Sequence, residues 1–457
     1  MLALILMAMT GAWAQTIDLS GVTEATTAKN GDVLTGILGA NVQISIADKA
    51  TVTLDGVTIN GTNTDGYFWA GITCLGDATI TLEGVNNVKG FRWEYPGIYI
   101  PDGKTLTIQG EGSLNVSSNG GAGIGGGEQT ACGNIVIKGG NINATGVFNS
   151  AGIGGSNGGL CGNITITGGN ITATSGNPLA SSIGAGSPGT CGTVTIGGII
   201  KESSIGSPFH YLSLADDKDN SSTLTTYNNK TSDVTLMRTL QTGGWNTFCA
   251  PFNISNSKLT AKGMTVKKLT SSSFDSSTGK LTLNFRDASS IEAGKPYLVE
   301  VNDNVVNPTF ENITVSNSTT TTETTYADLV PVMKPTKLTG GDKTVLFVSG
   351  GNKLTYPTGD GNINGFRANF KLKGAAATAR SFSMSFGDEE TGIEPLTIST
   401  DGEKTEAFPR EGWDGVFYDL QDRRIENLPT AKGIYIQNGR KIIIRSATQG
   451  DACQSKN

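Results

Sequence analysis

The sequence predicts an all-β protein: a right-handed parallel β-helix, then an antiparallel β-sandwich and a small C-terminal β domain. Two observations predict the β-helix. Strand-like runs that end in glycine recur through residues 51–198 at nearly constant spacing, and within each run apolar residues alternate with Thr or Asn. A third observation predicts the sandwich, because alternating runs joined by Ser/Thr/Asn/Gly turns continue from about residue 230 to 390.

The repeat contains more than one strand. The glycines fall at residues 56, 84, 110, 139, 168 and 197, so their spacings are 28, 26, 29, 29 and 30 residues. One repeat reads "AGIGG" 151–155, "NITIT" 163–167 and "NITAT" 170–174, which predicts three short strands around a triangular rung. A slip of one residue would turn Thr inward, so the alternation specifies the register. About six rungs cover roughly residues 30–205, and residues 15–30 cap the first.

The composition divides the chain into five segments: a signal peptide (1–14), the β-helix (15–205), a β-sandwich-like domain (206–390), an acidic linker (391–412) and a C-terminal β tail (413–457). "SPFHYLSLADDKDNSST" at 207–223 is interpreted as a transition between the first two domains. In the tail, two apolar runs flank Asn438-Gly439, which predicts a β-hairpin.

The apolar N-terminal run ends in Ala12-Trp13-Ala14, which predicts a secretory signal cleaved after Ala14 and a protein exported to the cell surface or beyond. No other apolar run is long enough to span a membrane. Charged residues make up 16% of the 457 residues, the net charge is −6, and no basic block occurs. Because phosphate binding requires clustered Lys and Arg, nucleic acid is not expected as a partner.

The cysteines form no C-x-x-C pair, so a zinc or redox motif is not supported. Cys132, Cys161 and Cys191 occupy the same position in successive repeats, about one rung apart, which is within the range of a disulfide. Three cysteines in one column leave one unpaired. We therefore interpret the column as a stack of small buried thiols, with a disulfide as the alternative.

The uncharged rungs argue against catalysis. Between Glu128 and Glu202 there is no Asp or Glu, and Lys138 is the only charged residue before Lys201. A hydrolase needs carboxylates that face the substrate, and a lyase needs a base with calcium held by carboxylates. The single histidine, His210, lies in the transition segment. We therefore do not expect an enzyme.

Acidic residues gather in the earlier rungs. Asp48, Asp77, Asp102 and Glu128 fall near one turn of successive rungs, where stacking would bring like charges close together. Calcium accepts oxygen clusters of this kind, so these four residues are a candidate calcium site. The alternative is a solvated acidic edge, because Asp-Gly is ordinary turn chemistry. No other cofactor is indicated.

Aromatic residues are concentrated in "YFW" 67–69 and "FRWEY" 91–95. Both segments precede the first strand of adjacent rungs, so we expect them to project side by side from one corner, with Phe148 at the same corner two rungs later. Sugars stack their C–H faces on aromatic rings and hydrogen-bond to charged side chains. The composition therefore predicts a glycan platform made of Tyr67, Trp69, Arg92, Trp93, Glu94 and Tyr95. The alternative is a loop cluster that packs on itself or on the neighbouring domain.

Two resemblances follow from these motifs. The region 51–200, with "TVTLDGVTING" and "CGNITITGGNITATS", resembles secreted bacterial carbohydrate-binding β-helix proteins. This resemblance implies binding of cellulose-like and acidic plant polysaccharides, with calcium bound along the rungs. The stretch 413–445 resembles the C-terminal sorting or surface-anchoring tails of exported Bacteroidota proteins, although here "SATQGDACQSKN" follows the final basic strand.

The leading expectation is non-catalytic polysaccharide binding or adhesion by an exported cell-surface protein, with a polysaccharide or cell-surface glycan as partner. A structural or adhesive surface protein without a glycan ligand is the main alternative. A polysaccharide lyase or hydrolase is the third.

Overall fold

The structure is a computed structural model that describes residues 14–201 and 204–387, together with four short strands between residues 417 and 444. The chain divides into two compact units, Met1–Thr397 and Ile398–Asn457. The described residues are nearly all β, and among them no helix is long and apolar enough to cross a membrane. Residues 1–13 of the predicted signal peptide and the predicted linker 391–412 lie outside the described residues.

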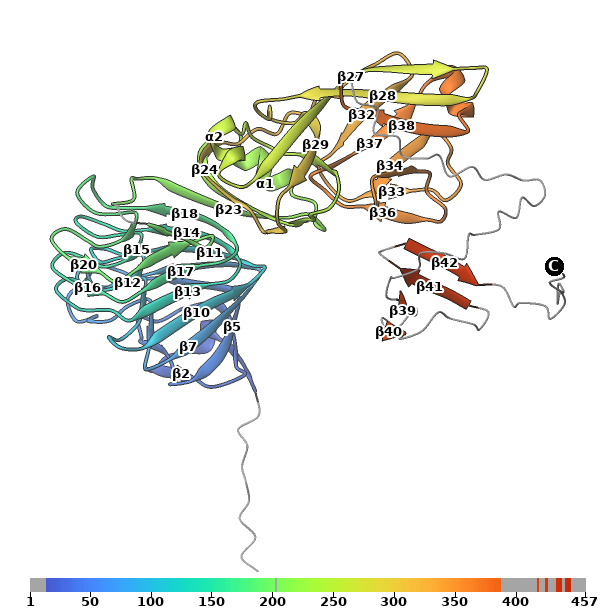
Figure 1. Cartoon of the computed structure of the whole chain (residues 1–457). Coiled ribbons are helices and arrows are strands. Elements are labelled where there is room, and N and C mark those ends of the chain that lie inside the picture. The colour runs from blue at the N-terminus through green and yellow to red at the C-terminus, as the bar shows by residue number, and fades with distance from the viewer. Residues whose placement is uncertain are drawn as a thin grey trace, which may run out of the picture. The chain divides into compact units, whose positions relative to one another are not determined.

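The first unit begins with a β-solenoid, as the repeat predicts, and the solenoid has about five turns rather than the predicted six or so (Figure 1). Each full turn adds one strand to each of three faces, and the strands within a face are parallel. Face one contains β2 (Thr26–Ala28), β4 (Ile44–Ile46), β6 (Ile72–Cys74), β9 (Ile98–Tyr99), β12 (Ile124–Gly125), β15 (Ile153–Gly154) and β19 (Ile183–Gly184).

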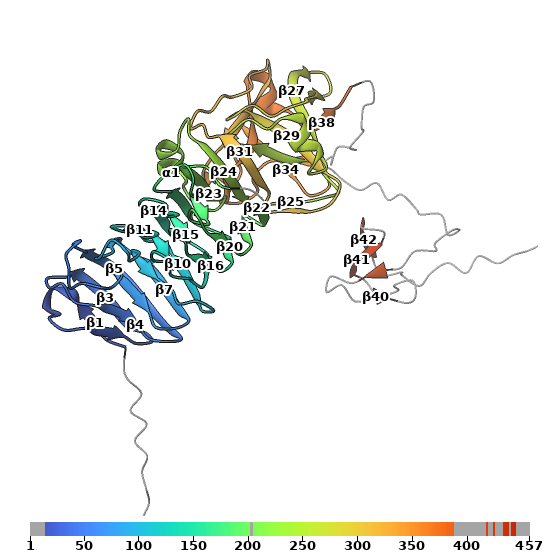
Figure 2. The same cartoon turned by 90° about the vertical axis from the view of Figure 1, so that its left-hand side faces the viewer.

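Faces two and three belong to one sheet, because the long strand β5 bends and contributes to both. Face two contains β1 (Thr16–Asp18), β3 (Val33–Ile37), β5 (Ala50–Asn60), β7 (Ala78–Glu83), β10 (Thr105–Gly110), β13 (Asn134–Ile137), β17 (Ile164–Ile166) and β21 (Val194–Ile196). Face three continues from β5 through β8 (Val85–Lys89), β11 (Ser113–Ser117), β14 (Asn141–Thr145) and β18 (Asn170–Thr174). Figure 2 shows the successive strands of the stack.

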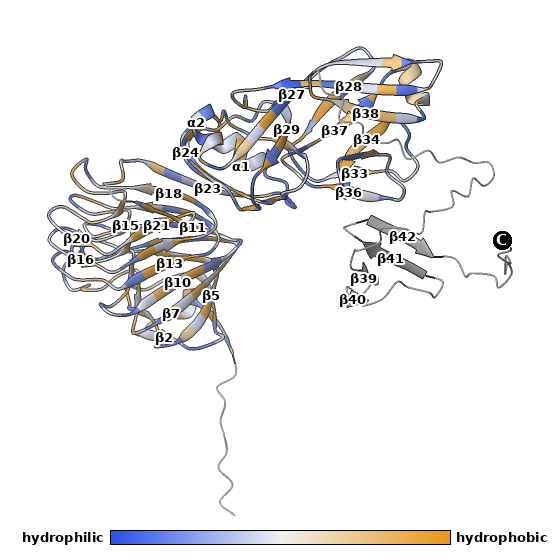
Figure 3. Cartoon of the chain, viewed as in Figure 1, coloured by the Kyte–Doolittle hydropathy of each residue, from blue (hydrophilic) through white to orange (hydrophobic). Residues whose placement is uncertain are grey.

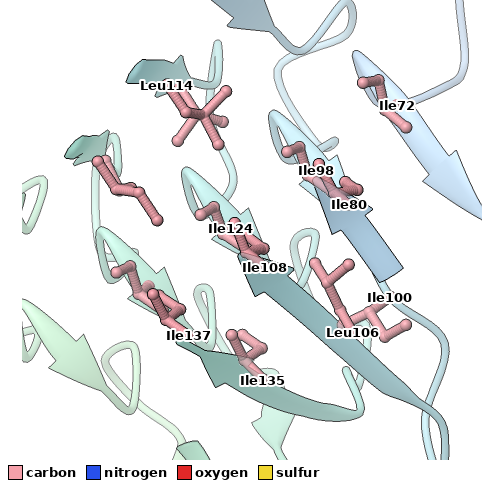
Figure 4. Close-up of a cluster of buried hydrophobic side chains, with 14 of the residues drawn as sticks. Ile72, Ile80, Ile98, Ile100, Leu106, Ile108, Leu114, Ile124, Ile135 and Ile137 are labelled. Atoms are coloured by element: carbon pink, nitrogen blue, oxygen red, sulfur yellow. The ribbon is translucent and has the colours of Figure 1, made fainter. Parts of the chain in front are cut away.

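Ladders of aliphatic side chains fill the space between the three faces. On face two, Ile80, Ile108 and Ile137 are paired in register, and on face one Ile98 pairs with Ile124. All five are fully buried, and Figure 4 shows Ile98 beside Ile80 and Ile124 beside Ile108. Figure 3 shows that apolar residues recur along these strands. The predicted register is therefore confirmed, since each ladder buries the apolar half of an alternating run.

The solenoid ends are covered. At the start, β1 pairs with β3, and the short 3-10 helix η1 (Leu19–Gly21) buries Leu19. At the other end, β22 (Ile199–Lys201) folds back on β21, and β23 (Phe209–Ala215) pairs antiparallel with β18. The interpretation of 207–223 as a mere transition is therefore wrong, because 209–215 is a strand. Covering the terminal rungs matters, since an open solenoid end would offer unpaired backbone groups and apolar surface.

The sheet of face three runs on into the next layer. After β23 come β24 (Thr231–Met237) and β31 (Thr309–Thr314), and the ammonium of Lys201 forms ion pairs with Asp233 and Glu311 across this junction. The two α-helices of this region, α1 (Ser221–Thr226) and α2 (Asn256–Thr260), are short. Backbone pairing and an ion-pair network therefore connect the solenoid to the residues that follow it.

Two further sheets complete the unit. One contains β26 (Asn246–Cys249), β29 (Pro296–Val301), β27 (Met264–Asp275), β28 (Lys280–Asp287) and β38 (Ser381–Ser385). The other contains β32 (Ala327–Val332), β37 (Arg367–Leu372), β34 (Val345–Ser349) and β35 (Lys353–Thr355). Two-stranded pairs link β25 (Thr239–Leu240) with β30 (Val305–Val306) and β33 (Thr336–Leu338) with β36 (Gly361–Ile363), and η2 (Gly374–Thr378) precedes β38.

The β26–β38 sheet is buried on both faces. Along β29, Tyr297 and Val299 join one core with Leu236 of β24, whereas Leu298 joins a second core with Phe370 of β37. The two sheets of the predicted sandwich are thus two layers of a three-layer arrangement, and the extension of the solenoid sheet forms the third layer.

The cysteine column is corrected by the structure. Cys161 and Cys191 form a disulfide with a Cα–Cα distance of 4.4 Å, and they lie in the small sheet of β16 (Leu160–Cys161) and β20 (Thr190–Cys191). Cys132 pairs in register with Cys161 but keeps a free, buried thiol. The interpretation as a stack of thiols is therefore wrong for two of the three residues.

Replacing both Cys161 and Cys191 with Ser is expected to lower the free energy of unfolding of the solenoid by about 2–3 kcal/mol, since the bond closes a long loop in the unfolded chain. Urea unfolding followed by circular dichroism measures the loss. Reductant should destabilise the unmodified protein and leave the double variant unchanged. Equal sensitivity of both proteins to reductant would contradict this prediction.

The second unit is described through four strands, β39 (Phe417–Tyr418), β40 (Arg424–Ile425), β41 (Gly433–Gln437) and β42 (Arg440–Ile444). β41 and β42 pair antiparallel, with Gln437 opposite Arg440, as predicted for the hairpin.

Candidate functional site

The two aromatic segments do stack at one corner of the solenoid, as predicted, and a single asparagine joins the backbones there. The side-chain amide of Asn119 donates hydrogen bonds to the carbonyl oxygens of Gly90 and Phe91, at 2.9 and 2.8 Å. The backbone N–H of Trp93 donates to the Asn63 side chain at 3.1 Å. A side chain at Gly120 would overlap with the carbonyl group of Trp93. Three successive rungs therefore hold the corner loops in place.

A pocket of about 700 Å³ lies beside this corner, over face one of the solenoid. We name it the corner pocket. Its lining includes the aromatic residues Phe68, Trp69, Trp93, Tyr95 and Tyr99. Its polar lining includes Gln43, Thr73, Glu94, Glu128, Gln129 and Thr130. Many aromatic walls with a few convergent polar groups are typical of a small-molecule or oligosaccharide site.

The floor of the corner pocket follows from the alternation in face one. Thr73 of β6 and Tyr99 of β9 are paired in register at outward positions, and the next outward position is Gly125. In the following rungs the same outward position is Gly154 and then Gly184. Among these five outward positions, only Thr73 and Tyr99 therefore have side chains that can contribute to the floor.

Trp69 lines the corner pocket and also packs against the solenoid core. Its ring lies 5.5 Å from Tyr67 and 5.7 Å from Phe91, centroid to centroid, and Phe91 is fully buried. Tyr67 and Trp69 both pack against the solenoid core. Tyr67 does not line the corner pocket, so its predicted role in the platform is not supported by the geometry. The buried indole N–H of Trp69 has no acceptor within the described part of the chain.

Arg92 also does not line the corner pocket. Its guanidinium forms an ion pair with Asp65, lies 3.6 Å from a Glu94 carboxylate oxygen and sits 5.3 Å from the centroid of the Phe68 ring. The prediction that Arg92 hydrogen-bonds a ligand is therefore replaced by a positioning role. A cation over an aromatic face holds that ring in place.

The charged lining of the corner pocket is purely acidic. Glu94 is held near Arg92, and the Glu128 carboxylate accepts a hydrogen bond from the Asn157 side chain at 2.9 Å. The backbone N–H of Glu128 donates to the Glu94 carbonyl at 2.8 Å, so the two residues lie on neighbouring rungs. Partial burial raises the pKa of Tyr99, so its phenol remains a neutral hydrogen-bond donor.

Two of the candidate calcium residues accept backbone hydrogen bonds from the next rung. Asp48 accepts a hydrogen bond from the backbone N–H of Asp77, and Asp77 accepts one from that of Thr105, at 2.9 and 2.8 Å. In a later rung, the side chain of the uncharged Asn134 accepts a hydrogen bond from the backbone N–H of Asn163 at 2.8 Å. Side chains at this corner therefore link successive rungs whether or not they are charged. Across the described ranges, no three His, Cys, Asp or Glu residues gather in a way that could hold a metal ion. Asp48, Asp77, Asp102 and Glu128 thus do not form one site there.

Sequence reasoning missed Asn119, which holds the corner loops, and several lining residues of the corner pocket, among them Gln43, Phe68, Thr73, Tyr99, Gln129 and Thr130. Phe68 lies between two residues of the predicted platform, and 54% of its surface is exposed. Tyr99 stands at the outward position of "GIYI", so the alternation itself could have identified it. Asn119 lies in a different rung, and only the fold shows that it joins the corner loops.

Comparison with known proteins finds no matching family model, no matching curated protein and no matching solved structure. The function is therefore inferred from the residues of the chain itself.

Proposed function

We propose that this protein binds polysaccharide without catalysis, through the corner pocket, as an exported surface protein or adhesin. The observation that carries the proposal is the lining of the pocket: four aromatic side chains, Phe68, Trp69, Trp93 and Tyr95, around a floor that offers Thr73 and a fifth aromatic residue, Tyr99. Trp93 is 37% exposed, so it can stack on the C–H face of a sugar ring without leaving the fold. An oxygen of the ligand that reached the indole N–H of Trp69 would also satisfy that donor.

The charge of the lining narrows the ligand class. Glu94 and Glu128 are the charged lining residues, and no Lys or Arg lines the corner pocket. A polyanion such as polygalacturonate would meet like charges there, whereas the carboxylates can accept hydrogen bonds from sugar hydroxyls. The corner pocket therefore suits a neutral polysaccharide of the cellulose-like class better than an acidic one.

Both carboxylates already have partners, which favours binding over hydrolysis. Glu94 lies 3.6 Å from the Arg92 guanidinium, within range of an ion pair, and the Glu128 carboxylate accepts a hydrogen bond from Asn157. General acid catalysis needs a carboxyl group that carries a proton to the glycosidic oxygen.

Affinity gel electrophoresis tests the proposal. Gels that contain hydroxyethylcellulose or a mixed-linkage β-glucan should retard the full chain relative to gels without polymer. Equal mobility in all gels would favour a structural or adhesive protein without a glycan ligand. Release of new reducing ends, or of unsaturated products, from these polymers would overturn the non-catalytic assignment.

A further inference from the structure

A second pocket, of about 820 Å³, lies in the layers that follow the solenoid. Its walls come from the loop 241–245, the turn 349–352 and the loop 357–359, with parts of β25, β26, β34, β36 and β37. Arg238 and Arg367 are its charged lining residues, and no Asp, Glu or Lys lines it. We name it the arginine pocket.

The positive charge of this pocket is only partly balanced. The guanidinium of Arg367 pairs with the Asp216 carboxylate at 2.6 Å. Arg238 is only 6% exposed, and its guanidinium donates hydrogen bonds to the backbone carbonyl oxygens of Thr247 and Phe366. Carbonyl oxygens carry no net charge, so two guanidinium groups share one carboxylate and leave a net charge of about +1 at the pocket.

Two further observations show that an anion would be stabilised here. The Nε–H of Arg238 is buried without an acceptor within the described residues. Burial, and then the neighbouring charge of Arg367, lowers the pKa of Arg238 to about 9, and the Asp216 carboxylate offsets this only in part. Buried cations are usually paired with an anion, because an unpaired charge in a low-dielectric site is costly.

The remaining lining indicates the shape of the ligand. Trp245 lines the pocket while its ring stacks on Phe386 at 4.8 Å between centroids, and its backbone N–H donates to the Asn352 side chain at 2.5 Å. The indole is therefore held rigidly at the wall. Gln241, Thr358 and Asn362 add amide and hydroxyl groups. Aromatic walls with amides suit a sugar ring, and a guanidinium fork matches a planar carboxylate.

We propose that the arginine pocket binds an acidic sugar, with the carboxylate directed toward Arg238 and Arg367 and the ring against Trp245. This site is separate from the corner pocket and takes the opposite class of glycan. The chain then carries one pocket with acidic lining and one with basic lining, which suits a mixed wall or matrix material that contains both neutral and uronate polymers.

Isothermal titration calorimetry on the full chain tests the proposal with trigalacturonate and its fully methyl-esterified, neutral form. We expect the acid to bind at least about tenfold more tightly than the ester, and its affinity to fall as salt is added. Equal binding of the two forms, or no heat from either at millimolar concentration, would overturn the proposal.

Variants separate a charge effect from loss of structure. Arg367→Gln should weaken trigalacturonate about tenfold, whereas Asp216→Asn should tighten it severalfold, because it removes the competing carboxylate. A purely structural role for the Arg367–Asp216 pair would make both variants weaker, and that result would reject the site. Lys353→Gln removes a nearby cation that does not line the pocket and should leave the affinity unchanged. Failure of this proposal and failure of the corner pocket proposal are distinguishable, because trigalacturonate tests the arginine pocket and neutral polymers test the corner pocket.

Discussion

Trp93→Ala combined with Phe68→Ala is expected to abolish retention of the protein in neutral polysaccharide gels, with a loss of about tenfold in affinity for each ring. Both side chains line the corner pocket, and they are 37% and 54% exposed, so a sugar can reach them. Because 37% exposure leaves most of the Trp93 side chain in contact with the fold, the free energy of unfolding should fall by about 1–3 kcal/mol while the solenoid stays folded. Affinity gel electrophoresis and urea unfolding measure the two quantities.

The solenoid supplies a matched control for this experiment. Phe148 is 61% exposed in a later corner loop, but it does not line the corner pocket. Phe148→Ala should therefore leave retention unchanged. If it reduces retention as much as the double variant does, the protein binds through general surface hydrophobicity, and the assignment of the corner pocket fails.

Trp69 should not be used in place of Phe68. The sequence suggests that Trp69 and Trp93 are equivalent members of an exposed platform that could be removed without affecting the fold. In the structure Trp69 packs on Phe91 and the solenoid core, so Trp69→Ala would mix a loss of stability with any loss of binding.

Gly154→Ala is expected to cost about 4 kcal/mol of solenoid stability, a large effect for a single methyl group. Gly154 has a φ of +128°, which L side chains rarely adopt, and its Cβ would overlap with the carbonyl oxygen of Gly184 in the next turn. The oxygen cannot move aside because it belongs to the backbone of a stacked rung, and the Cβ cannot rotate away because it is bonded directly to the backbone of the other rung. Urea unfolding followed by circular dichroism measures the loss, and hydrogen exchange over residues 141–196 locates it.

Gly21→Ala is the control for this substitution. No atom lies within 4 Å of the position that its Cβ would take, and its φ is not in the left-handed region. It should change stability by less than about 1 kcal/mol. A similar loss for both variants would mean that the contact between stacked rungs does not account for the cost at Gly154, because the change in chain entropy from Gly to Ala favours the fold.

The sequence determined the solenoid because its constraints are local and periodic. The alternation in runs such as 163–167 specifies which side chains face inward, and the glycine spacing sets one turn. The hairpin of β41 and β42 followed for the same reason, since a two-residue turn between apolar runs defines its own register. The aromatic corner was also predictable, because residues one repeat apart must stack.

Only the tertiary structure decided which members of that corner face a ligand. Tyr67 and Tyr95 are both half-buried aromatics, yet one packs on the core and the other lines the corner pocket. That difference depends on loop geometry within a few ångströms, which no periodic pattern encodes. The sequence also did not predict that the solenoid sheet continues through β23, because the repeat pattern ends before that strand begins.

The arginine pocket could not be predicted from the sequence. Arg238, Trp245 and Arg367 are spread over 130 residues, and each is an ordinary residue in its own segment. The charge imbalance arises only when folding places two guanidinium groups near one carboxylate, Asp216. Periodic sequence therefore determined the scaffold, whereas long-range packing and desolvation decided where its charged and aromatic surfaces are available for binding.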